Sequence, residues 1–200
     1  MISAVRNLAL AIVAFLGASL LSGCGINTIP TYEEQAKAAW SEVLNQYQRR
    51  SDLIPNLVET VKGYAAHEKD VLTAVVEARA KATQVTVPTD ALTNPELMKQ
   101  FQENQNALGG ALARLLAVVE NYPDLKANQN FLALQSQIEG TENRIAVARR
   151  DYIEAVRLYN TELRTFPGRI WASILYSDAK PMATFDIPAE QQQAPKVQFN

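Results

Sequence analysis

The sequence predicts an all-α protein: an antiparallel up-and-down four-helix bundle with long first and fourth helices, an N-terminal signal segment and a loose C-terminal tail. The chain holds only 8 glycines in 200 residues, and most of its 9 prolines lie at segment edges, which leaves the long uninterrupted stretches that favour helices. Within these stretches apolar residues recur at alternating spacings of three and four, as in an amphipathic helix. Turn sequences separate four such segments, so neighbouring helices are expected to fold back on one another.

The composition is that of a globular protein, with 48% hydrophobic and 20% charged residues. A formal net charge of −2 provides no basic field, and we expect no nucleic-acid partner. A single cysteine excludes an internal disulfide. With one histidine and no metal-binding motif, the sequence predicts neither a metal site nor a cofactor.

Residues 1–23 are interpreted as a lipoprotein signal peptide. Arg6 gives a short positive region, and an almost purely apolar run of 14 residues follows from Leu8 to Leu21. A spanning helix needs about 20 residues and a signal-peptide core about 7–15, so the run fits a signal. It ends in LSGC (21–24), which resembles the cleavage box of bacterial lipoproteins. The alternative is an uncleaved membrane anchor with an incidental cysteine.

Lipidation of Cys24 would make the membrane a partner of the protein, with residues 24–30 as a lipidated spacer. Stable anchoring takes more than one acyl chain, and lipoproteins of this kind carry two or three. Gly25 occupies the position where an aspartate favours retention in the inner membrane. We therefore expect a lipoprotein of the bacterial cell envelope, at the outer membrane and facing the periplasm if the cell is Gram-negative.

The first helix is predicted to start at Thr31, an N-cap with Glu34 at capping-box distance. Pro55 lies within its pattern and either bends the helix or starts a new one. The bend is favoured because the apolar seam keeps its phase, and the Asn56 side chain is the expected donor to the freed carbonyl of Ser51. The seam consists of Ala36, Trp40, Val43, Tyr47, Ile54, Leu57 and Val61.

A turn near residues 63–67 precedes a second predicted helix at 68–83, and residues 84–95 read as a loop. Thr93 or Asn94 caps the third helix, with Pro95 at its first position. That helix stops before Pro123.

The fourth helix is predicted to open at Asp124 and to end at Pro167-Gly168, about 40 residues and about 60 Å long. RIWASILY (169–176) resembles a short docking helix, and residues 177–200 read as a flexible tail. The seam of the fourth helix consists of Phe131, Leu134, Ile138, Thr141, Ile145, Ala148, Tyr152, Val156, Tyr159, Leu163 and Phe166.

Two long blocks of the sequence resemble the LemA family. They are AWSEVLNQYQRRSDLIPNLVETVKGYAAHEKDVLTAVVEARAKA (39–82) and YPDLKANQNFLALQSQIEGTENRIAVARRDYIEAVRLYNTELRTFP (122–167), and the C-terminal PKVQF matches the family's usual ending. The resemblance implies that residues 31–176 form a membrane-tethered up-and-down helical bundle, without agreed catalytic residues and loosely linked to envelope and membrane-organising functions. The usual member begins with a transmembrane helix, whereas this chain has a lipoprotein signal in its place.

No catalytic set is predicted, and the protein is not expected to be an enzyme. His67 would need a nucleophile and an orienting partner, and the adjacent Glu68 points elsewhere on a helix. Glu139 and Glu142, with Asn143, would form an acid–base site only if their environments separated their pKa values. A solvated face is the default interpretation of these acids.

Charged and aromatic residues are also given structural interpretations. Arg49-Arg50 with Asp52, and Arg149-Arg150 with Asp151, are expected to form ion pairs rather than anion sites, with the stem of Arg50 packed in the seam. Gly109-Gly110 would permit a close helix approach or a kink. The aromatic residues Trp40, Tyr47, Tyr152, Tyr159 and Phe166 are expected in the core, whereas Trp171 and Tyr176 dock onto the bundle end or meet a partner.

The sequence thus favours a non-catalytic envelope scaffold or protein-interaction module, with envelope proteins as partners and self-association left open. One alternative is a cell-envelope hydrolase, or an accessory factor of a peptidase, that uses acidic residues. The other is a carrier of a small ligand within the bundle.

Overall fold

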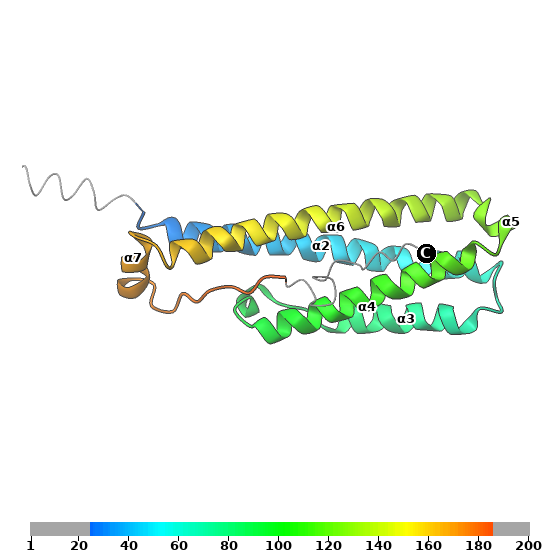
Figure 1. Cartoon of the computed structure of the whole chain (residues 1–200), viewed down its shortest axis with the longest axis horizontal. Helices are drawn as coiled ribbons and strands as arrows, with labels where there is room; N and C mark the ends of the chain where they lie inside the picture. The colour runs from blue at the N-terminus through cyan, green and yellow to red at the C-terminus, as the bar shows by residue number, and fades with distance from the viewer. Residues whose placement is uncertain (1–24, 186–200) are drawn as a thin grey trace, which may run out of the picture.

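The computed structural model describes residues 25–185 (Figure 1). This part of the chain is all-helical, as predicted, and contains no β-strand. Its elements are α2 (Thr28–Lys62), α3 (Lys69–Gln84), the 3-10 turn η1 (Thr89–Ala91), α4 (Pro95–Val119), α5 (Pro123–Lys126), α6 (Gln129–Glu162) and α7 (Gly168–Ile174). The predicted signal peptide and Cys24 lie outside the described residues.

The helices α2, α3, α4 and α6 run lengthwise beside one another, and we call them the helical body (Figure 1). α2 pairs with α6, α3 pairs with α4, and α2 also contacts α3. At about 1.5 Å per residue, the 35 residues of α2 make a rod of about 50 Å. One end of the helical body, which we call the near end, holds α7 and the start of α2. The opposite end, which we call the far end, holds α5 and the turn after α2.

The first helix begins at Thr28, so the prediction of Thr31 as its N-cap is wrong. The Thr31 backbone N–H already donates to the Asn27 carbonyl at 3.1 Å. Ile29 is buried in the core, which favours this earlier start. Pro30 is tolerated in the first turn because backbone N–H groups there have no helical partner.

Pro55 lies inside α2, and the helix continues through it without a break. A proline cannot donate to the carbonyl four residues earlier, here that of Ser51. Arg79 of α3 supplies a donor, with its Nε 2.9 Å from the Ser51 carbonyl oxygen. The expected bond from Asn56 is therefore replaced by one from a neighbouring helix.

The loop before α4 ends in the predicted cap. Asn94 Oδ1 accepts hydrogen bonds from the backbone N–H groups of Glu96 and Leu97 at 3.1 and 3.2 Å, and Pro95 opens the helix. Of the two predicted cap residues, Asn94 makes these bonds.

The prediction of one fourth helix from Asp124 is wrong. The chain first makes the single turn α5, and α6 then starts at Gln129 and ends at Glu162, which shortens it to 34 residues. Asn128 caps α6, accepting from the Phe131 N–H at 3.1 Å. Its side-chain nitrogen also donates to the Tyr64 hydroxyl at 2.9 Å, which ties the start of α6 to the turn after α2.

The first part of the predicted flexible tail packs against the helical body. The Asn160 side chain donates to the Met182 carbonyl and accepts from its N–H, both at 2.9 Å. The Ala183 N–H donates to the Leu92 carbonyl at 2.8 Å. Met182 and Phe185 are buried, so apolar burial holds residues 177–185 in place. The sequence had predicted that these residues belong to a flexible tail.

Candidate functional site

A buried arginine lies midway along the helical body, between two apolar clusters. Arg50 is 3% exposed and donates to Glu142 Oε1 at 2.8 Å and to Gln105 Oε1 at 2.6 Å. Its guanidinium carbon lies 5.1 Å from the centroid of the Tyr47 ring. Gln105 in turn donates to the Ala82 carbonyl at 3.1 Å. The predicted packing of the Arg50 stem and pairing of its head are therefore confirmed, with Glu142 of α6 as the counter-ion.

A cavity of about 200 Å³ opens beside this polar layer and is lined partly by Ser51, Tyr47 and Gln105. The Ser51 hydroxyl is buried and has no hydrogen-bond partner within residues 25–185. A water occupies about 30 Å³, and drug-sized ligands occupy pockets of about 300–1,000 Å³. The cavity therefore has room for several waters and is smaller than the pockets that hold drug-sized ligands.

The aromatic residues around Trp40 fill the near half of the helical body. Trp40 Nε1 donates to the Val87 carbonyl at 2.7 Å, and its ring centroid lies 5.0 Å from that of Tyr152 and 5.8 Å from that of Phe185. The Tyr152 hydroxyl donates to the Ala183 carbonyl at 2.8 Å, and burial raises the pKa of Tyr152 above its ordinary value. The predicted core positions of Trp40, Tyr47, Tyr152 and Tyr159 are confirmed.

Phe166 is 82% exposed, so its predicted place in the core is wrong. Because α6 ends at Glu162, the turn that follows takes Phe166 off the apolar seam. Trp171 and Tyr176 pack against the core cluster instead, in agreement with the predicted docking of residues 169–176.

The four residues weighed for catalysis fall into two separate groups: His67 and Glu68 at the turn after α2, and Glu139 and Glu142 on α6. His67 is exposed in the turn after α2. Glu68 accepts from the Tyr122 hydroxyl at 2.8 Å, a hydrogen bond that raises the pKa of Tyr122. Glu139 is exposed on α6, and Glu142 pairs with Arg50. No acid–base pair is assembled from these side chains within residues 25–185.

The remaining predicted charge pairs are partly rearranged. Arg150 pairs with Asp151 at 3.0 Å, as expected. Asp52 accepts from the Gln48 side chain at 2.7 Å rather than from Arg50. The guanidinium of Arg149 lies over the Phe185 ring, 4.3 Å from its centroid, in a cation–π contact.

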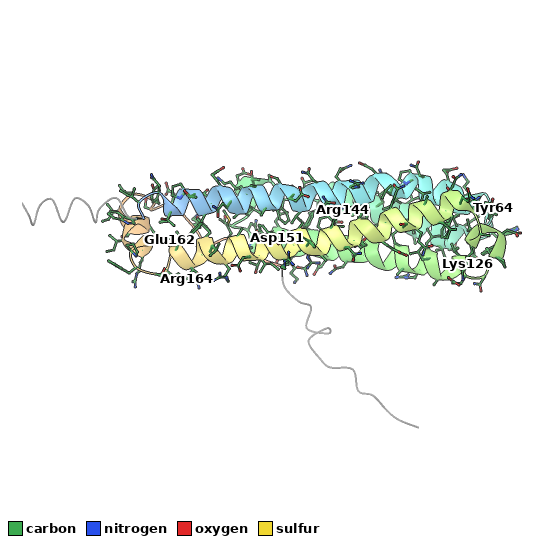
Figure 2. All side chains as sticks on the ribbon, turned by 90° about the horizontal axis from the view of Figure 1, so that it is seen from above. Tyr64, Lys126, Arg144, Asp151, Glu162 and Arg164 are labelled. Carbon is green, nitrogen blue, oxygen red and sulfur yellow. The ribbon has the colours of Figure 1, made fainter. Side chains whose placement is uncertain are left out.

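A shallow hollow of about 300 Å³ lies on the outer face of the α2–α6 pair, where Figure 2 labels Arg144 and Asp151. Arg144 crosses to α2, and its Nε donates to Gln46 Oε1 at 3.2 Å. Val147, also on α6, is 47% exposed. The hollow is lined by Glu42, Gln46, Asn143, Arg144, Val147, Ala148 and Asp151. Its charged rim and apolar floor are features of protein-interaction surfaces.

A second groove, of about 540 Å³, opens at the near end beside η1 and the segment after α7. Lys37 lines it and is held by Glu33 and Glu34 at 2.8 and 2.9 Å. These carboxylates raise the pKa of Lys37 above its ordinary value. The groove is open and mixed in polarity, unlike the enclosed apolar interior that a ligand carrier would use.

Sequence reasoning missed three side chains that join distant segments: Arg79, Gln105 and Asn128. Arg79 and Gln105 carry no local signal, because each bonds a group on another helix. Asn128 could have been identified, since asparagine is a preferred N-cap residue and the apolar seam begins three residues later, at Phe131.

Residues 25–185 contain no group of three or more His, Cys, Asp or Glu side chains placed to hold a metal ion. None of the helices in this part of the chain combines the length and apolarity needed to cross a bilayer.

Paired long helices joined by a buried polar layer, with an aromatic core at one end, define an all-helical protein of elongated build. The chain belongs to the LemA family, whose sequence pattern matches residues 39–199. The resemblance drawn from the two sequence blocks is therefore confirmed.

Curated relatives are distant. The chain is 29% identical to magnetosome protein MamQ 2 of Paramagnetospirillum magneticum and 26% identical to magnetosome protein MamQ of Magnetospirillum gryphiswaldense, with 82% of this chain and 65% of each relative covered. It is 24% identical to protein LemA of Metamycoplasma hominis, with 70% of this chain and 60% of the relative covered. The chain thus spans less than two thirds of the length of each of these proteins.

Proposed function

We propose that this LemA-family protein is a non-catalytic lipoprotein of the bacterial envelope, tethered through lipid on Cys24. Its up-and-down four-helix bundle would act as a protein-interaction module on the periplasmic side, at the outer membrane of a Gram-negative cell. The described chain starts at the near end, one residue after Cys24, and the far end lies about 50 Å away along α2. A tether at one end leaves the long faces of the helices free for a partner.

The α2–α6 hollow is the observation that supports an interaction role. Val147 is 47% exposed within a rim of charged and amide side chains, an arrangement in which a partner's apolar group would be desolvated while the rim excludes water. The acids considered for catalysis each accept a hydrogen bond from another side chain, Glu68 from Tyr122, Glu139 from Gln135 and Glu142 from Arg50, so they give the hydrolase alternative no comparable support.

Mass spectrometry of the mature N-terminus, combined with membrane fractionation, tests the anchor. We expect cleavage before Cys24, acyl chains on that residue and recovery in the membrane fraction. The Cys24→Ser variant should retain its signal and lack the acyl mass. A wild-type protein that begins elsewhere, or that carries an unmodified Cys24, would contradict the lipoprotein proposal.

Crosslinking in intact envelopes tests the interaction module. A photoreactive residue at Gln46, on the rim of the hollow, should capture specific adducts that the additional change Val147→Glu abolishes. Val76→Glu, on α3 and at a similar exposure of 51%, is the matched control and should leave the adducts unchanged. Adducts with a second copy of the chain would identify self-association, whereas adducts insensitive to Val147→Glu would refute the role of the hollow.

A further inference from the structure

The near end of the rod carries exposed apolar side chains on and beside α7. They are Phe166, Ile170, Ile174 and Leu175, which are 82, 44, 67 and 53% exposed, and we call them the end patch. Ile170 and Ile174 are four residues apart in a helix and therefore share one face. Soluble surfaces rarely gather large apolar side chains this densely without a partner.

The covalent path of the chain identifies what lies opposite the end patch. Gly25, the first described residue, packs beside α7: a Cβ built on it would lie 3.3 Å from Pro167 Cγ and 3.8 Å from Trp171 Nε1. Cys24 directly precedes Gly25 in the sequence, so a lipid tether on Cys24 would reach the body at this end. The apolar run of residues 8–21 also precedes Gly25 in the sequence, so an uncleaved anchor would enter the body at the same end. Either form of anchor, acylated cysteine or uncleaved helix, brings the bilayer to the end patch.

Two cationic side chains beside the end patch fit a lipid surface. Arg164 and Arg169 are exposed beside Phe166, and no carboxylate within residues 25–185 pairs with either of them. Figure 2 places Arg164 at the near end, with Tyr64 and Lys126 at the opposite end. Arginine side chains next to an apolar surface reach the headgroups while the apolar groups enter the acyl boundary.

We infer that the end patch inserts into the bilayer interface and orients the rod, so that the membrane holds the body both through its anchor and through α7. The backbone of Gly168 packs closely against the Glu162 carbonyl oxygen, with no room for a Cβ, so the start of α7 is held tightly against the end of α6. The end patch is thus a second membrane contact, held in a fixed position beside Gly25. This inference rests on the membrane tether of the proposed function, but not on its chemical form.

Two single-residue reporters test the contact in the full-length protein. Phe166→Trp puts an indole on the end patch, and Tyr64→Trp puts one at the far end, where Tyr64 is 46% exposed. Each variant is reconstituted in vesicles of phosphatidylethanolamine and phosphatidylglycerol, with and without lipids brominated on their acyl chains. The native Trp40 is fully buried, and the wild-type protein gives the background from Trp40 and Trp171.

We expect brominated lipid to quench the added emission of Phe166→Trp and to leave that of Tyr64→Trp unchanged. Adding Ile170→Ser and Ile174→Ser to the Phe166→Trp protein should reduce the quenching at least about twofold, because each change removes buried apolar area from the interface. Val76→Ser and Leu132→Ser, at exposed apolar positions on α3 and α6, should not change it.

Equal quenching at both ends, or none at Phe166→Trp, overturns the inference. So does an end patch that crosslinks to a second copy while its reporter stays unquenched. Mass spectrometry of the same samples separates the two proposals. Acylated Cys24 with an unquenched reporter refutes only the insertion of the end patch into the bilayer, and quenching without acylation refutes only the lipoprotein anchor.

Discussion

Replacing Pro55 with alanine should stabilise the protein and remove most of the contribution of Arg79. Pro55 has no backbone N–H, so the Ser51 carbonyl has no donor within α2 and accepts a hydrogen bond from Arg79 Nε at 2.9 Å instead. In the Pro55→Ala variant, the backbone N–H of the new residue would donate to that carbonyl along the helix axis. The Arg79 bond would then become redundant.

The magnitudes follow from the burial of the groups. A hydrogen bond to a charged donor contributes about 1.5–3 kcal/mol, and the partial exposure of Arg79 places its bond near the lower value. A proline within a regular helix costs about 3 kcal/mol relative to alanine, part of which Arg79 already offsets. We therefore expect Pro55→Ala to raise the free energy of unfolding by about 1–2 kcal/mol and Arg79→Met to lower it by about 1.5 kcal/mol.

Urea unfolding followed by far-ultraviolet circular dichroism, on the four proteins of the double-mutant cycle, measures the coupling. In the Pro55→Ala background, Arg79→Met should cost less than about 0.5 kcal/mol, which gives a coupling of about 1 kcal/mol. Arg114→Met, at an arginine of α4 with no ion pair within residues 25–185, serves as the control and should show no coupling. An equal cost of Arg79→Met in both backgrounds would refute the reasoning.

Three other predictions concern stability. Arg50→Met should lower the free energy of unfolding by about 2–4 kcal/mol, because it leaves polar groups of the central layer without a partner. Glu142→Gln should lower it by less, because the Glu142 side chain is half-exposed. Urea titrations that gave the reverse order would contradict this prediction. Gly110→Ala should stabilise α4 by about 0.5–1 kcal/mol in thermal melts, because a Cβ there meets nothing within 4 Å; a lower Tm would contradict it. Burial raises the pKa of Tyr152 in the folded state, so as pH rises the unfolded state loses the Tyr152 hydroxyl proton first, and the free energy of unfolding should fall as pH rises above 10.0. Tyr152→Phe should make this fall shallower in urea titrations at a series of pH values. An unchanged slope in the variant would contradict the prediction.

The spacing of apolar residues predicted most of the helices because burial on one face is a local property of the sequence. Each predicted seam residue of the first helix, from Ala36 to Val61, is buried. The seam of the predicted fourth helix begins only at Phe131, so it did not reveal that a single turn precedes α6. A seam reports which face is apolar, whereas caps and turns decide where a helix begins.

Contacts between distant segments were the main part that the sequence did not reveal. The bond from Arg79 to Ser51 depends on how α3 packs beside α2, and no local pattern records that arrangement. The docking of Met182 and Phe185 depends on a site that the earlier helices build, while the tail that contains them, residues 177–200, holds three prolines and the run QQQ. For the candidate site, charged residues could be assigned to ion pairs, but not to particular partners such as Glu142 for Arg50.

The aromatic core around Trp40 joins the two extremes of the described chain, since Ile29 and Phe185 belong to the same cluster. A polypeptide is synthesised from its first residue onward, so this cluster stays incomplete until the last of its members has emerged. A product truncated before Met182 would keep its helices yet expose Trp40 and Tyr152 to water, a surface that quality-control proteases degrade. Complete burial of these rings therefore requires that residues 182–185 have been synthesised and have docked.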